Sequence, residues 1–190
     1  MSRKARHATI WLMNSCDFLS QALKKARARL LDPTPLARDC GRLCGAACCQ
    51  TDEQGRGGML LFPGEAALYE GRMPAGFAIH PDDSVLPGGT LLTCSGTCQR
   101  EDRPLACRVF PLVMRLAEAG EPRLALDPRA WPICPLMPSG MAGLSSGFVE
   151  AAEDAARTLA QVPEFRAFLA AQTAFLGRLQ QPLWKDGVAT

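Results

Sequence analysis

Several features that would assign a function directly are missing from this sequence. No apolar run approaches the roughly 18 residues of a membrane-spanning helix, so we expect no contact with a membrane. The sequence has no Gly-rich phosphate loop and no nucleophile elbow, which removes two large classes of enzyme from consideration. It has only two histidines, His7 and His80. His80 is either a metal ligand or acid–base group, or a hydrogen-bonded turn residue.

The chain also has little net charge. Lys and Arg number 21 and Asp and Glu 19, for a formal charge of +2. Basic residues gather before residue 32, with seven basic groups against Asp17. Aromatic residues do not alternate with them, as a nucleic-acid stacking platform would require. We therefore interpret this arm as a solvated helix face and expect no nucleic-acid partner. A protein partner at the basic N-terminal helix or the C-terminal helices is the alternative.

The start of the chain does not resemble a secretory signal. Basic residues at 3, 4 and 6 precede an apolar stretch of only Ile10 to Met13, with no small-residue cleavage site after it. We expect a cytoplasmic protein. In that compartment thiols stay reduced and can bind metal.

Apolar residues are 47% and charged residues 21%, which is ordinary for a globular domain. Apolar positions at three- and four-residue steps predict helices over 8–31, 147–161 and 163–180. Strands are expected at 59–62, 77–80 and 90–94, with a hairpin at 109–117 and 123–126 and a short helix at 65–70. These elements predict an α+β fold with a small cysteine-rich metal-binding core and short strands. An N-terminal helix (1–35) and a C-terminal helix pair (139–190) flank the cysteine-cluster domain (36–138).

The nine cysteines are the residues of this sequence that point most directly to a function. Cys16 stands alone in the first predicted helix, where a small buried hydrophobic residue is the simplest interpretation. The other eight cysteines fall into clusters: Cys40, Cys44, Cys48, Cys49, Cys94, Cys98, Cys107 and Cys134. Clustered thiolates select zinc or iron–sulfur centres. Eight are enough for two four-Cys zinc sites, two iron–sulfur clusters or centres that share thiolates.

The spacing within the first cluster allows two local structures. Cys40, Cys44 and Cys48 are four residues apart, so a helix would place them on one face. A loop would let Gly41 and Gly45 wrap the backbone around a metal instead. Both alternatives remain open from the sequence.

Charged residues near the thiols are candidates for roles beside the metal. A tetrathiolate zinc site carries a net charge of −2, which nearby arginines offset. Arg103 and Arg108 flank Cys107 closely, so we expect them to contact sulfur or a bound anion. Glu65 is either a functional acid or a carboxylate favoured by the start of a helix.

The stretches CGRLCGAACC at 40–49, LFPGE at 61–65, CSGTC at 94–98 and RPLACRVFP at 103–111, with Cys134-Pro135, resemble the zinc- or iron-chelating cysteine-cluster family, the YkgJ-like proteins. The resemblance covers about residues 40–136. The family core is CxxCxxCC, whereas the gaps here hold three residues. The resemblance implies a zinc or iron site in a protein of unassigned role, and Glu65 matches a recurrent acid. Flagellin lysine N-methylases carry a similar cluster.

The sequence thus predicts a metal-binding protein that chelates zinc or iron, including an iron–sulfur cluster, through up to eight Cys thiolates. One alternative is an iron–sulfur redox enzyme or an enzyme associated with methyl transfer. The other is a zinc-stabilised interaction module. A radical-SAM enzyme is disfavoured because its Cys-x3-Cys-x2-Cys spacing is absent.

Overall fold

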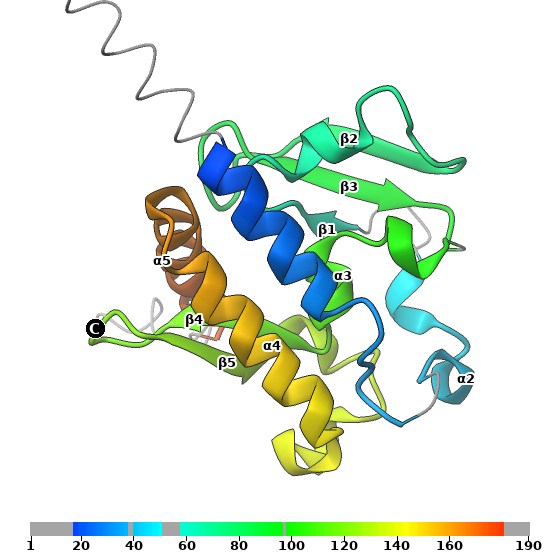
Figure 1. Ribbon diagram of the computed structural model, residues 1–190. Helices are drawn as coiled ribbons and strands as arrows, with labels where there is room; N and C mark the ends of the chain where they lie inside the picture. Colours follow the sequence, from blue (N-terminus) through cyan, green and yellow to red (C-terminus); the bar gives the residue numbers. More distant parts are fainter. Residues whose placement is uncertain (1–16, 38–39, 51–57, 97, 181–190) are drawn as a thin grey trace, which may run out of the picture.

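The computed structural model describes residues 17–37, 40–50, 58–96 and 98–180. Within them the fold is α+β, as the sequence predicts (Figure 1). Residues 17–29 are helical. The other α-helices are α2 (Gly41–Cys44), α3 (Leu105–Val109), α4 (Ser146–Leu159) and α5 (Pro163–Leu179). The strands are β1 (Met59–Leu60), β2 (Phe77–Pro81), β3 (Thr90–Cys94), β4 (Leu112–Leu116) and β5 (Pro122–Leu126). Among the described residues, six 3₁₀ helices connect them, including η1 (Ala47–Cys49), η2 (Glu65–Tyr69) and η3 (Arg100–Asp102).

The strands form two antiparallel sheets. The first has the order β1-β3-β2, with β3 in the centre and Leu92 opposite both Met59 and Ile79. The second is the β4–β5 hairpin, in which Met114 pairs with Leu124. β3 ends at Cys94, so the central strand of the first sheet delivers a thiol at its end.

The main core lies between the hairpin and the helices that cover it. α5 contacts β4 and α4 contacts β5. Leu23, Ala26 and Leu30 from the N-terminal helix join the same cluster as Phe148 of α4 and Phe165 of α5. The N-terminal helix and α4 lie close together in Figure 1, and an ion pair joins Arg29 to Asp154. Elements from both ends of the described chain therefore share one apolar core.

The predicted helices and most predicted strands are confirmed. Pro163 opens α5, a position where its fixed φ suits the helix and its missing N–H costs nothing. The start of the predicted helix 8–31 lies outside the described residues. One expectation was wrong in detail. Val109 belongs to α3 and not to the hairpin, which begins only at Leu112 after a cis Phe110–Pro111 peptide. The expected helix at 65–70 is the 3₁₀ helix η2.

The cysteines do not build the main core. The described cysteines are half-buried except Cys48, which is exposed. Cys94 and Cys98 pack on the edge of a second apolar cluster around Tyr69 and Leu92. The core is thus aliphatic and aromatic, with the thiols at its margin. No helix in the described part of the chain is long and apolar enough to cross a membrane.

Candidate metal centre

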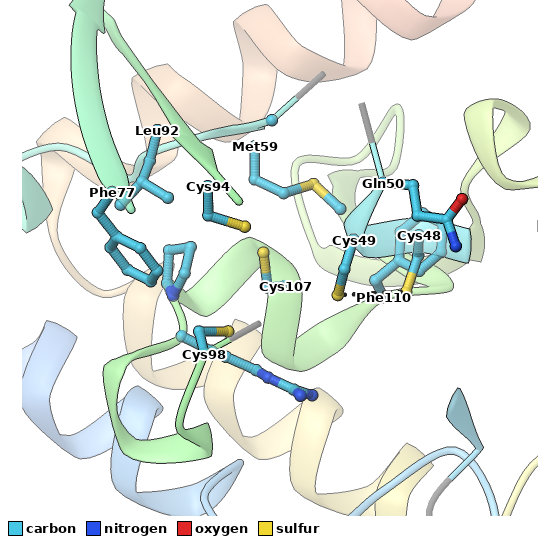
Figure 2. Close-up of a pocket in the computed structure, with 13 residues that line it drawn as sticks. Cys48, Cys49, Gln50, Met59, Phe77, Leu92, Cys94, Cys98, Cys107 and Phe110 are labelled. Carbon is cyan, nitrogen blue, oxygen red and sulfur yellow. Dashed lines mark hydrogen bonds between the residues drawn. The ribbon is translucent and has the colours of Figure 1, made fainter. Parts of the chain in front are cut away.

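Five of the eight predicted ligands line one cavity of about 50 Å³. They come from two separate stretches of the sequence. Cys48 and Cys49 lie on η1, Cys94 ends β3, Cys98 follows it, and Cys107 lies on α3. Figure 2 shows Cys49, Cys94 and Cys107 gathered around the same space. Tertiary structure therefore joins the two sequence clusters into one site.

The remaining wall of the cavity is largely apolar. It is formed by Phe77 and Leu92 on the first sheet, Met59 beside them, Phe110 after α3, and Pro104. Such walls exclude water and strengthen electrostatic interactions inside the cavity. No sequence pattern pointed to these residues, because each occupies an ordinary apolar position in its own segment.

The cysteine spacing of the segment 40–49 allowed either one continuous helix or a loop, and the structure has a loop between two short helices. α2 ends at Cys44, and Gly45 and Ala46 both adopt left-handed conformations, with φ of 60° and 56°. These two residues break the helix before η1 begins. Cys48 and Cys49 therefore sit on a separate turn, and the segment wraps as a loop instead of presenting one continuous helix face.

The adjacent residues Cys48 and Cys49 place their sulfur atoms close together. Their Sγ atoms lie 3.9 Å apart, nearly twice the length of a disulfide bond. Two thiolates bound to one tetrahedral zinc at the usual Zn–S distance lie about 3.8 Å apart. The Cys48–Cys49 pair is thus in hydrogen-bond contact, at a separation that two ligands on one metal ion also have.

Electrostatic interactions link Cys49 to most of the cluster. Cys49 interacts with its neighbour Cys48, and also with Cys98 and Cys107. Cys40 and Cys44 do not line the cavity, but both interact with Cys48. Cys49 therefore interacts with thiols of both sequence clusters.

The environment disfavours uncompensated thiolates. Burial raises the pKa of Cys107 well above its ordinary value, and the neighbouring thiols add to the shift. Burial also raises the pKa of Cys98, although Arg103 opposes that shift. The hydrogen bond with Cys49 and burial raise the pKa of Cys48. Several negative sulfurs in this space need a positive charge to offset them.

Cys134 lies elsewhere. It packs against a third apolar cluster formed by Phe110, Ala130 and Met137, and it is not among the residues that line the cavity. Phe110 and Met59 line the cavity and also belong to this cluster or pack on it, so Cys134 lies behind one wall of the cavity.

The thiols do not form a complete coordination sphere as they stand. Among the described residues, no three or more His, Cys, Asp or Glu side chains are arranged to hold a metal ion. The cavity gathers the donors without arranging their sulfurs around one centre. The donor set itself, with several thiolates and an apolar wall, fits zinc or iron.

Arg103 is the charged residue that lines the cavity. Its side chain hydrogen-bonds Cys98, and its charge also acts on Cys49 and Cys107. The Arg103 Nε–H is buried and has no hydrogen-bond acceptor within the described ranges. An unpaired buried donor of this kind costs about 1–3 kcal/mol. Arg103 therefore lies beside the thiols, where the sequence placed it.

Arg108 occupies a different place from the one expected. Its guanidinium donates to the carbonyls of Arg103 (2.9 Å), Arg27 (2.8 Å) and Glu101 (2.6 Å). Burial, together with the nearby Arg27 guanidinium, lowers the pKa of Arg108 to about 10. Arg108 thus fixes the backbone that carries Arg103, and in this arrangement its donors are directed at carbonyl oxygens and not at sulfur.

Glu65 is fully buried and lies outside the cavity lining. Its carboxylate accepts hydrogen bonds from the backbone N–H groups of Phe62 (3.1 Å) and Leu105 (2.7 Å) and pairs with Arg27. Burial raises its pKa, and these three partners oppose the shift. Glu65 therefore joins the N-terminal helix, η2 and α3 behind the site. The sequence did not single out Arg27 as its partner.

His80 lies on β2, is exposed, and makes a 3.2 Å contact with Thr93 Oγ1 across the sheet. It does not line the cavity. The alternative of a hydrogen-bonded turn residue is correct about the hydrogen bond but wrong about the turn, because His80 lies within a strand.

Comparisons with protein-family models, curated proteins and solved structures found no match to this chain.

Proposed function

We propose that this protein binds zinc or iron through the thiolates gathered at the cavity, as a member of the cysteine-cluster type that its motifs resemble. The observation that carries the proposal is the convergence of Cys48, Cys49, Cys94, Cys98 and Cys107 on one cavity. Chance placement does not account for five thiols that come from two separate stretches of the sequence.

The 3.9 Å separation of the Cys48 and Cys49 sulfurs supports a tetrahedral thiolate centre. The apolar wall and the Arg103 guanidinium supply what such a centre needs around it, namely exclusion of water and a cation that offsets thiolate charge. A bound metal would supply Lewis acidity if it is zinc, or electron transfer if it is an iron–sulfur cluster.

The chain's own residues hold the thiols in place. Cys107 is positioned by α3, whose first N–H is bound by Glu65. Cys94 is positioned by its register opposite Phe77 in the first sheet. The ligands on β3 and α3 therefore rest on packed secondary structure, whereas the 40–49 loop supplies the adaptable side of the site.

The test is competitive zinc titration of the reduced protein against a chromophoric chelator, without oxygen. We expect Cys107→Ser to weaken zinc binding at least tenfold. Cys16→Ser is the matched control, because Cys16 lies apart from the sequence clusters, and it should bind zinc like the parent protein. Equal zinc affinity of the Cys107→Ser variant and the parent would contradict the proposed site.

A further inference from the structure

We infer that Arg103 forms a binding site for a small inorganic anion beside the metal, so that the centre is open to an exogenous ligand and not closed by protein thiolates. This inference rests on the proposed function and deepens it. The class of ligand is a small monovalent anion.

The first observation is the unpaired donor. Arg103 Nε–H is buried at the site and has no acceptor in the described part of the chain, even though the same guanidinium hydrogen-bonds Cys98. Buried polar groups are almost always paired, so a donor left over at a cavity indicates a partner that arrives from outside. Arg103 also forms no ion pair with a carboxylate among the described residues.

The second observation is that the backbone of Arg103 is held firmly. Its carbonyl accepts the 2.9 Å bond from Arg108 Nε, and its N–H donates to the carbonyl of Arg100 at 3.2 Å. Pro104 follows and fixes φ at the next residue. A side chain that starts from a fixed backbone keeps its donor group directed at one place, which is the requirement for a built anion site.

The third observation is the size and lining of the cavity. About 50 Å³ is room for roughly three or four water-sized groups. That space admits an anion such as azide or chloride, and it is too small for a nucleotide or a peptide. Apolar neighbours such as Phe77 and Leu92 strengthen the attraction between the guanidinium and an anion.

The experiment uses the full chain loaded with Co²⁺, whose visible absorption reports the ligands of a thiolate centre, and sodium azide as the probe. We expect azide to shift the cobalt bands of the parent protein in a saturable titration. Arg103→Gln should raise the azide dissociation constant at least tenfold. Arg103→Lys, which keeps the charge but lacks the Nε–H group, should also weaken azide binding. Arg42→Gln is the matched control, since it removes one exposed positive charge near the cysteines without touching the cavity, and it should change the constant less than twofold.

The outcomes separate the two proposals. Cobalt binding with no azide response in the parent protein would overturn the anion site and leave the metal site standing. Equal azide constants in the parent and Arg103→Gln proteins would do the same. If Arg103→Gln fails to take up cobalt, the azide titration of Arg103→Lys tests the anion site instead. An azide dissociation constant equal to the parent's would then overturn the role of the Arg103 Nε–H group. Absence of cobalt uptake by the parent protein would overturn both proposals.

Discussion

Glu65 accepts a 2.7 Å hydrogen bond from the backbone N–H of Leu105, which lies 40 residues further along the chain. Leu105 is the first residue of α3, and Cys107 stands two residues later in the same short helix. A helix of this length has little stability of its own. The buried carboxylate therefore holds in place the element that carries a central thiol.

The first prediction concerns Glu65. Glu65→Ala removes the acceptor of two backbone N–H groups and leaves the Arg27 guanidinium, at 11% exposure, without its ion pair. Removal of one partner of a buried pair costs about 3–5 kcal/mol. Urea unfolding should show this loss. Glu70→Ala is the control, because Glu70 is exposed on the same segment, and it should change the free energy of unfolding by less than about 0.5 kcal/mol.

The second prediction concerns Gly58 at the cavity wall. Its φ of +137° is unfavourable for other residues, and an added Cβ would lie 2.4 Å from the Leu92 carbonyl oxygen. Gly58→Ala should therefore destabilise the fold by about 1–3 kcal/mol and weaken zinc binding, since Leu92 also lines the cavity. Gly147→Ala in α4 meets no atom within 4 Å. It should be neutral or stabilising by up to about 1 kcal/mol. Thermal denaturation of the two variants, side by side, measures the difference.

The third prediction separates Cys134 from the other cysteines. Because Cys134 packs on Ala130 and Met137 and does not line the cavity, Cys134→Ser should keep the zinc affinity of the parent protein, whereas Cys94→Ser should lose it. Metal analysis after gel filtration gives the answer. A loss of zinc in Cys134→Ser equal to that in Cys94→Ser would restore Cys134 to the ligand set that the sequence predicts.

The fourth prediction is that metal binding weakens as the pH falls. Thiols must lose their protons to bind metal, and burial raises the pKa of Cys107 and Cys98, so the metal-free site holds these protons at neutral pH. Zinc uptake should release at least one proton, and zinc affinity should fall about tenfold or more for each pH unit between 8 and 6. Calorimetric titration in buffers of different ionisation enthalpy counts the protons. An affinity independent of pH would show that buried thiols are not the ligands.

The helices and the first sheet could be predicted from the sequence because their signals are local. The C-terminal helices follow their apolar period, and β3 spans the residues expected for it. α3 was missed because residues 105–109 are too few to show a period, and the helix is held by the distant Glu65.

The sequence predicted a set of candidate ligands, but not how they divide in space. Only the fold shows that Cys107 faces the same cavity as Cys49, or that Cys134 lies in another cluster. The same holds for Arg103 and Arg108, which precede Cys107 by four residues and follow it by one. Their different placements depend on the carbonyls of Arg27 and Glu101, which accept hydrogen bonds from the Arg108 side chain.

The most direct test of metal binding is elemental analysis of zinc, iron and acid-labile sulfide, with an absorption spectrum, on protein purified without oxygen. We expect at least one zinc or iron per chain. If the centre is an iron–sulfur cluster, iron should be accompanied by sulfide and by broad absorption at about 400 nm. Folded protein with reduced thiols and no metal would contradict it.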